Sequence, residues 1–252
     1  MLRGRLSVTE PVETAIENAP NEPPFARQLV AELTGTFLLT LVAAGTTVVA
    51  ARTPGSGSVS GRAIAPALII AAAIYALGDI SGAHFNPVVT VAFALRRDFR
   101  LSKVVPYWTA QVAGAISAAL LLRAWFGRVG DVGRNHLEVT QAKGVSIEAV
   151  LTAVLVTVII NVANKHSLVG PDAALPVGAT IASCHLLGMT LTGASMNPAR
   201  SLGPAIVARH LHSVWIYLIG PLIGAGAAVA LSYVLHPRRN PDEARAAQGE
   251  DQ

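Results

Sequence analysis

Two nearly identical phrases hold the residues of this chain that are most able to do chemistry. Ser-Gly-Ala-His-Phe-Asn-Pro-Val occupies residues 81–88, and Thr-Gly-Ala-Ser-Met-Asn-Pro-Ala occupies residues 192–199. Asn-Pro followed by apolar residues is typical of a helix start, with asparagine as the N-cap and proline at the first helical position. The apolar segments 86–95 and 197–208 would reach only the middle of a bilayer, at about 1.5 Å per residue. They predict two half-helices whose N-termini meet in a pore.

The two asparagines, Asn86 and Asn197, are the predicted pore residues. Each side-chain oxygen would cap its own helix and leave the NH₂ group as a donor for a passing oxygen atom. The positive ends of both helix dipoles would repel cations, protons included. The preceding residues are expected to descend as extended loops whose carbonyl groups line the path: Gly82, Ala83, His84, Gly193 and Ala194.

Six longer apolar stretches are predicted to position these half-helices. A bilayer core needs about 20 helical residues, and the stretches lie near 26–50, 63–80, 103–125, 146–164, 174–191 and 212–235. Because each half contains three spans, the second half must be inverted relative to the first. The expected fold is therefore an all-α membrane protein in which six transmembrane helices and two re-entrant half-helices form an inverted repeat. Its predicted parts are a tail (1–25), a first repeat (26–125), a connecting loop (126–145), a second repeat (146–235) and a tail (236–252).

The composition supports a polytopic membrane protein. Hydrophobic residues make up 52% of the chain and charged residues 13%, with a mean hydropathy of +0.50. The basic residues lie mostly between the spans and form no basic stripe interleaved with aromatics, which argues against a nucleic-acid partner. The basic residues are slightly more frequent on the side that carries both tails, so both termini are expected in the cytoplasm. Both tails are expected to be disordered, and the protein is expected in the plasma membrane. A single cysteine, Cys184, excludes an internal disulfide and cysteine-based metal sites, and neither a metal nor a cofactor is expected.

The chain resembles the aquaporins, members of the major intrinsic protein family, from about residue 27 to 235. Besides the two phrases above, the resemblance is carried by Ala31-Glu32, by Ala199-Arg200-Ser201 after the second Asn-Pro, and by Gly220-Pro221. The family implies six spanning helices, two re-entrant half-helices and a homotetramer in the lipid bilayer with one pore per subunit.

The resemblance also implies roles for individual residues. Arg200, His185 and Ser195 would form a selectivity filter, and Glu32 and Glu148 would brace the re-entrant loops by accepting backbone N–H bonds. Counting back along the sequence from Asn86 without a gap places Pro66 at the fourth filter position, where water channels typically have an aromatic residue.

The predicted function is a passive water channel that excludes protons and ions. Because Pro66 replaces the usual aromatic residue, the alternative prediction is a broader pore for small neutral solutes such as ammonia, hydrogen peroxide, glycerol or urea. A secondary transporter could share inverted repeats and broken helices, but no coupling carboxylate lies beside either Asn-Pro. An enzyme is not expected, because His-Glu-x-x-His and Gly-x-Ser-x-Gly are both absent.

Overall fold

The computed structural model describes residues 23–53, 55, 58–163 and 171–236, which fold into helices joined by loops without any strand. The first half contains α2 (Phe25–Arg52), α3 (Val59–Ser81), α4 (Pro87–Leu95) and α5 (Leu101–Phe126). A short 3₁₀ helix, η1 (Val129–Gly133), leads to the second half. That half contains α6 (Gln141–Ala163), α7 (Pro171–Gly188), α8 (Pro198–Ala208) and α9 (Ile216–Leu235).

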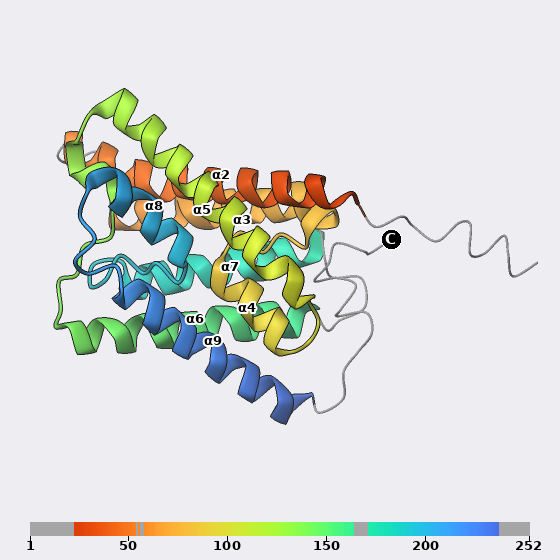
Figure 1. Ribbon diagram of the computed structural model, residues 1–252. Coiled ribbons are helices and arrows are strands. Elements are labelled where there is room, and N and C mark those ends of the chain that lie inside the picture. Colours follow the sequence, from red (N-terminus) through yellow and green to blue (C-terminus); the bar gives the residue numbers. More distant parts are fainter. Residues whose placement is uncertain (1–22, 54, 56–57, 164–170, 237–252) are drawn as a thin grey trace, which may run out of the picture.

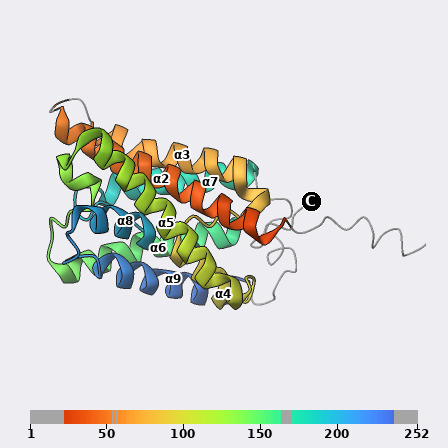
Figure 2. The same cartoon turned by 45° about the horizontal axis from the view of Figure 1, so that its top comes forward.

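The long helices run alongside one another and enclose the two short ones. Figures 1 and 2 show α4 and α8 extending toward opposite ends of this bundle. Five described helices, α2, α3, α5, α6 and α9, are long and apolar enough to cross a membrane. The sixth predicted span, 174–191, corresponds to α7, whose described apolar part is shorter. The prediction that the helix continues to residue 191 is wrong, because α7 ends at Gly188 and the chain then turns toward the second Asn-Pro.

Both half-helices start as the sequence predicts. The Asn86 side chain accepts from the N–H of Val88 at 3.1 Å, and Asn197 accepts from the N–H of Ala199 at 3.0 Å. Proline follows each cap at the first helical position, where its missing N–H has no consequence. Asparagine therefore marks the point at which each loop becomes helix.

Close helix contacts repeat between the two halves. A Cβ atom on Gly114 of α5 would lie 2.2 Å from the Leu33 carbonyl oxygen of α2. A Cβ atom on Gly224 of α9 would lie 2.2 Å from the Ala149 carbonyl oxygen of α6. Leu33 and Ala149 each follow the glutamate of their repeat, so a glycine and the equivalent backbone position make the same crossing twice. Small residues let helix backbones approach in this way without a strong hydrophobic driving force.

Replacing Gly224 with alanine is expected to destabilise the protein. The added methyl group would overlap the Ala149 carbonyl and force the helices apart, at a cost of about 1–3 kcal/mol. Gly226 supplies the matched control, because a Cβ atom there has no neighbour within 4 Å. Thermal unfolding in detergent should show a lower midpoint for G224A and an unchanged or slightly higher midpoint for G226A. Equal midpoints for the two variants would contradict the crossing.

Some predicted boundaries need correction. The loop expected over 126–145 spans only 127–140, because α5 continues to Phe126 and α6 begins at Gln141. The last span begins at Ile216 rather than at residue 212, since residues 212–215 form turns. Nearly all of both predicted tails, over 1–22 and 237–252, lies outside the described residues.

Candidate functional site

Two buried glutamates hold the loops that precede the half-helices. In the first repeat, Glu32 accepts from the N–H groups of His84 at 2.9 Å and Phe85 at 2.7 Å. In the second repeat, Glu148 accepts from the N–H groups of Ser195 at 2.9 Å and Met196 at 2.8 Å. Both glutamates are fully buried. Each carboxylate thus satisfies N–H groups that have no water to bind at this depth.

A hydroxyl also donates to the glutamate in each of these braces. Ser81 donates to Glu32 at 2.8 Å, and Thr192 donates to Glu148 at 2.7 Å. The carbonyl groups of these two residues accept from tyrosine hydroxyls on the last helix of each repeat, Tyr107 at 3.0 Å and Tyr217 at 2.7 Å. Sequence reasoning missed this role of the tyrosines, although their matching places in the two repeats are a signal that could have found them.

The loops are not extended as the sequence predicts. Gly82, Ala83 and Phe85 have φ values of 79°, 49° and 47° in the first loop. Their counterparts Gly193, Ala194 and Met196 have values of 84°, 45° and 53°. Left-handed backbone at non-glycine residues is strained. The glutamate hydrogen bonds stabilise it, because they fix the N–H groups of Phe85 and Met196.

The two asparagines connect the repeats. Asn86 donates from Nδ2 to the Met196 carbonyl at 2.8 Å, and Asn197 donates from Nδ2 to the Phe85 carbonyl at 2.8 Å. Each NH₂ group has two hydrogens, so this bond leaves one of them per asparagine. Both asparagines line a buried cavity. The sequence predicted that each NH₂ group would be wholly free. Instead, one of its two hydrogens is donated to a carbonyl group of the other repeat.

Two cavities adjoin each other inside the bundle, and the asparagines line one of them. The first, here called the pore cavity, has a volume of about 90 Å³, and its lining includes both asparagines. The second, here called the η1-side vestibule, has a volume of about 310 Å³ and lies beside the loop after η1. Ala43, His185 and Arg200 line both cavities. These three residues therefore mark the junction of the two cavities.

The junction residues from the sequence prediction offer defined hydrogen-bonding groups. His185 Nδ1 lies 2.9 Å from the Ile181 carbonyl, which can only accept, so this nitrogen carries a proton. When the ring is neutral, Nε2 is then an acceptor. Arg200 is 5% exposed, and its Nε and Nη1 have no hydrogen-bond partner among the described residues. The junction thus combines one acceptor with free guanidinium donors.

The other two expected filter residues lie differently. Ser195 lines the pore cavity, but its hydroxyl is hydrogen-bonded to Ser201 and to the Asn197 carbonyl. Pro66 lines the η1-side vestibule without reaching the pore cavity. Ala43 on α2 lies at the junction instead. Sequence reasoning missed Ala43 because an alanine inside an apolar helix has no distinguishing signal.

The predicted loop residues divide between the cavities. Gly82, Ala83 and His84 line the pore cavity, and Gly193 lines the vestibule. Ala194 is fully buried among core residues and lines neither cavity. The His84 ring contacts Thr90 Oγ1 at 3.0 Å and stacks on Phe93 with ring centroids 5.0 Å apart. The His84 ring in this lining is therefore held by a hydroxyl and an aromatic neighbour.

Two half-helices that meet at capping asparagines inside a helical bundle define a membrane channel of the re-entrant type. The family model for the major intrinsic proteins, described as "Major intrinsic protein", matches residues 20–233. The chain belongs to the major intrinsic protein family, whose members are channels rather than enzymes.

Plant relatives and one solved structure agree with this assignment. Aquaporin NIP1-1 of Oryza sativa subsp. japonica is 40% identical over 210 residues, covering 81% of this chain and 72% of the relative. Nodulin-26 of Glycine max is 39% identical over 203 residues, covering 80% and 75%. The aquaglyceroporin structure from Plasmodium falciparum superposes with a TM-score of 0.72 at 21% identity, covering 85% of this chain and 98% of that one. The structural likeness supports the fold.

Proposed function

We propose that this protein is a passive water channel that excludes protons and ions. The observation that carries the proposal is the pair of asparagines in the pore cavity, each with one amide hydrogen left after its bond to the opposite loop. Two fixed donors there would orient a water oxygen and interrupt a chain of water molecules along which a proton could pass. The positive ends of α4 and α8 point to the same place and repel cations.

The pore cavity lining supports passive flow rather than coupled transport. Among the described residues that line it, none is an aspartate or a glutamate. A transporter driven by protons or cations needs such a group near the midplane. In proteoliposomes, water flow should therefore have a low activation energy and should not respond to proton or sodium gradients. Uptake that depends on either gradient would overturn the channel proposal.

A second candidate function is a broader pore for small neutral solutes. It is favoured by Ala43, which leaves the junction opposite His185 and Arg200 without an aromatic side chain. The solved relative in the structural comparison is named an aquaglyceroporin, and the plant relatives carry the names aquaporin and nodulin. Ammonia, hydrogen peroxide, glycerol and urea are the solutes to compare with water.

Replacing Ala43 with phenylalanine is expected to narrow the junction. Ala43 is 4% exposed and contacts both cavities, so an aromatic ring there would extend into the path. Stopped-flow measurements should show glycerol and urea permeability lost before water permeability falls. Ala72→Phe is the matched control, since Ala72 is an exposed residue of α3. Unchanged solute flux in a folded A43F variant would show that the junction lies elsewhere.

We propose also that the assembled channel is a homotetramer in the plasma membrane with both termini in the cytoplasm. The family resemblance supports the tetramer, and the placement of the basic residues supports the orientation. The η1-side vestibule would then face the outside of the cell.

A further inference from the structure

The η1-side vestibule gathers positive charge from three separate elements. Arg62 comes from α3, Arg134 from the loop after η1 and Arg200 from α8, and all three line this cavity. Glu138 is the only carboxylate among the described residues of the lining. The other titratable residues of the lining are His136 and His185. A cavity of this composition attracts anions, because its walls focus the field of the arginines.

Two of the three arginines have hydrogen-bond donors to spare. Arg200 is almost fully buried, yet its Nε and Nη1 have no partner in the described part of the chain. The Nε of Arg62 is likewise buried and without a partner there. The remaining contact of Arg62, from Nη2 to Thr47 Oγ1, is long at 3.5 Å. Buried donors of this kind are costly unless something accepts from them.

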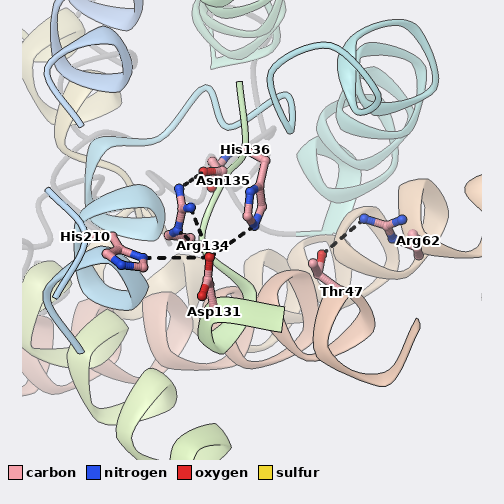
Figure 3. Close-up of polar contacts among 7 residues, drawn as sticks. All are labelled: Thr47, Arg62, Asp131, Arg134, Asn135, His136 and His210. Atoms are coloured by element: carbon pink, nitrogen blue, oxygen red, sulfur yellow. Dashed lines mark hydrogen bonds and ion pairs between the residues drawn. The ribbon is translucent and has the colours of Figure 1, made fainter. Parts of the chain in front are cut away.

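The third arginine is held in position by its neighbours. Arg134 Nε and Nη2 both lie 3.0 Å from Asp131 Oδ2, and Figure 3 shows this carboxylate between Arg134, His136 and His210. Burial and the neighbouring Arg134 lower the pKa of His136 from its ordinary value, which favours the neutral ring at pH 7. At neutral pH the positive charge of the vestibule therefore comes from its arginines.

We propose that the η1-side vestibule is a binding site for a small oxyanion of the sulfate and phosphate class, and that the bound anion obstructs the pore junction. The planar guanidinium fork suits tetrahedral oxyanions. A cavity of about 310 Å³ accommodates such an ion with part of its water. The anion stops at Arg200, because the pore cavity beyond is lined largely by apolar side chains that cannot replace its hydration.

Binding is tested with sulfate, which keeps its charge near neutral pH. Isothermal titration calorimetry on the full-length protein in detergent should show sulfate binding that is weakened about tenfold in Arg62→Gln, the loss expected for one charge-assisted hydrogen bond. Arg52→Gln is the matched control, since Arg52 is exposed at the end of α2 and does not line the vestibule. No binding heat in the wild type, or equal weakening in the two variants, would overturn the proposal.

Obstruction is tested by water flow. Stopped-flow shrinkage of proteoliposomes, with sulfate equal on both sides and an impermeant sugar as the osmotic agent, should slow as sulfate replaces chloride at constant ionic strength. The half-inhibitory concentration should rise in R62Q and stay unchanged in R52Q. Sulfate binding without any effect on water flow would contradict obstruction. This second part rests on the proposed water channel, whereas the calorimetry does not, so failure of either proposal can be recognised separately.

Discussion

Replacing Glu148 with alanine is expected to abolish water permeability. Three donors, the Thr192 hydroxyl and the N–H groups of Ser195 and Met196, would lose their acceptor at once. Each buried donor left without a partner costs about 1–3 kcal/mol. The left-handed backbone at Ala194 and Met196 would lose its restraint, so the second loop would leave the pore. Proteoliposomes with E148A should shrink no faster than empty liposomes.

Two further variants separate this effect from a simple loss of charge. Glu148→Gln keeps one acceptor oxygen but directs an NH₂ group at an N–H donor, so an intermediate permeability is expected. Asp79→Ala removes an exposed carboxylate at the end of α3 and should leave permeability at the wild-type level. The same ranking is expected for thermal stability in detergent. A folded E148A protein with normal water flow would show that the brace is dispensable.

Replacing Arg200 with valine is expected to relax selectivity strongly. The change removes both a permanent positive charge and the bulk of a guanidinium from the junction of the two cavities. Proton and cation leak should rise roughly tenfold or more, since each 1.4 kcal/mol taken from a barrier is a factor of ten. Glycerol and urea should also enter faster, because the junction becomes wider and less polar.

Leak and solute size can be measured separately. A pH-sensitive dye inside proteoliposomes reports proton entry, and light scattering reports solute entry. Arg200→Lys keeps the charge without the planar fork, so it should exclude protons while changing the order of solute permeabilities. Arg52→Val, at an exposed site, should behave as wild type. Unchanged proton and solute entry in R200V would remove Arg200 from the filter.

The repeated Asn-Pro phrases made most of the fold predictable. Asparagine caps and proline starts act locally, so the helix starts after Asn86 and Asn197 follow from the residues themselves. The apolar stretches likewise predicted the membrane helices with errors of only a few residues at most ends. The placement of Glu32 and Glu148 under the loops rested on the family resemblance, because spacing alone does not show where a buried carboxylate finds its partners.

The residues at the junction were less predictable, for physical reasons. Counting along the chain selected Pro66, but the cavity boundary depends on how α2 and α3 pack, and that packing brings Ala43 to the junction. The left-handed residues Ala83 and Phe85 were also missed, since their strain is stabilised by a glutamate far away in the sequence. His185 lines both cavities together with Arg200, yet its tautomer depends on a carbonyl in its own helix.

The crossed bonds of the asparagines impose an order on biosynthesis. Asn86 donates to the carbonyl of Met196, a residue 110 positions later in the chain. While the first repeat is being made, this acceptor does not exist, and lipid offers no substitute for it. The first half-helix therefore reaches its final place only after translation of the second loop. Each repeat thus supplies a hydrogen-bond acceptor that the asparagine of the other repeat needs in the folded structure.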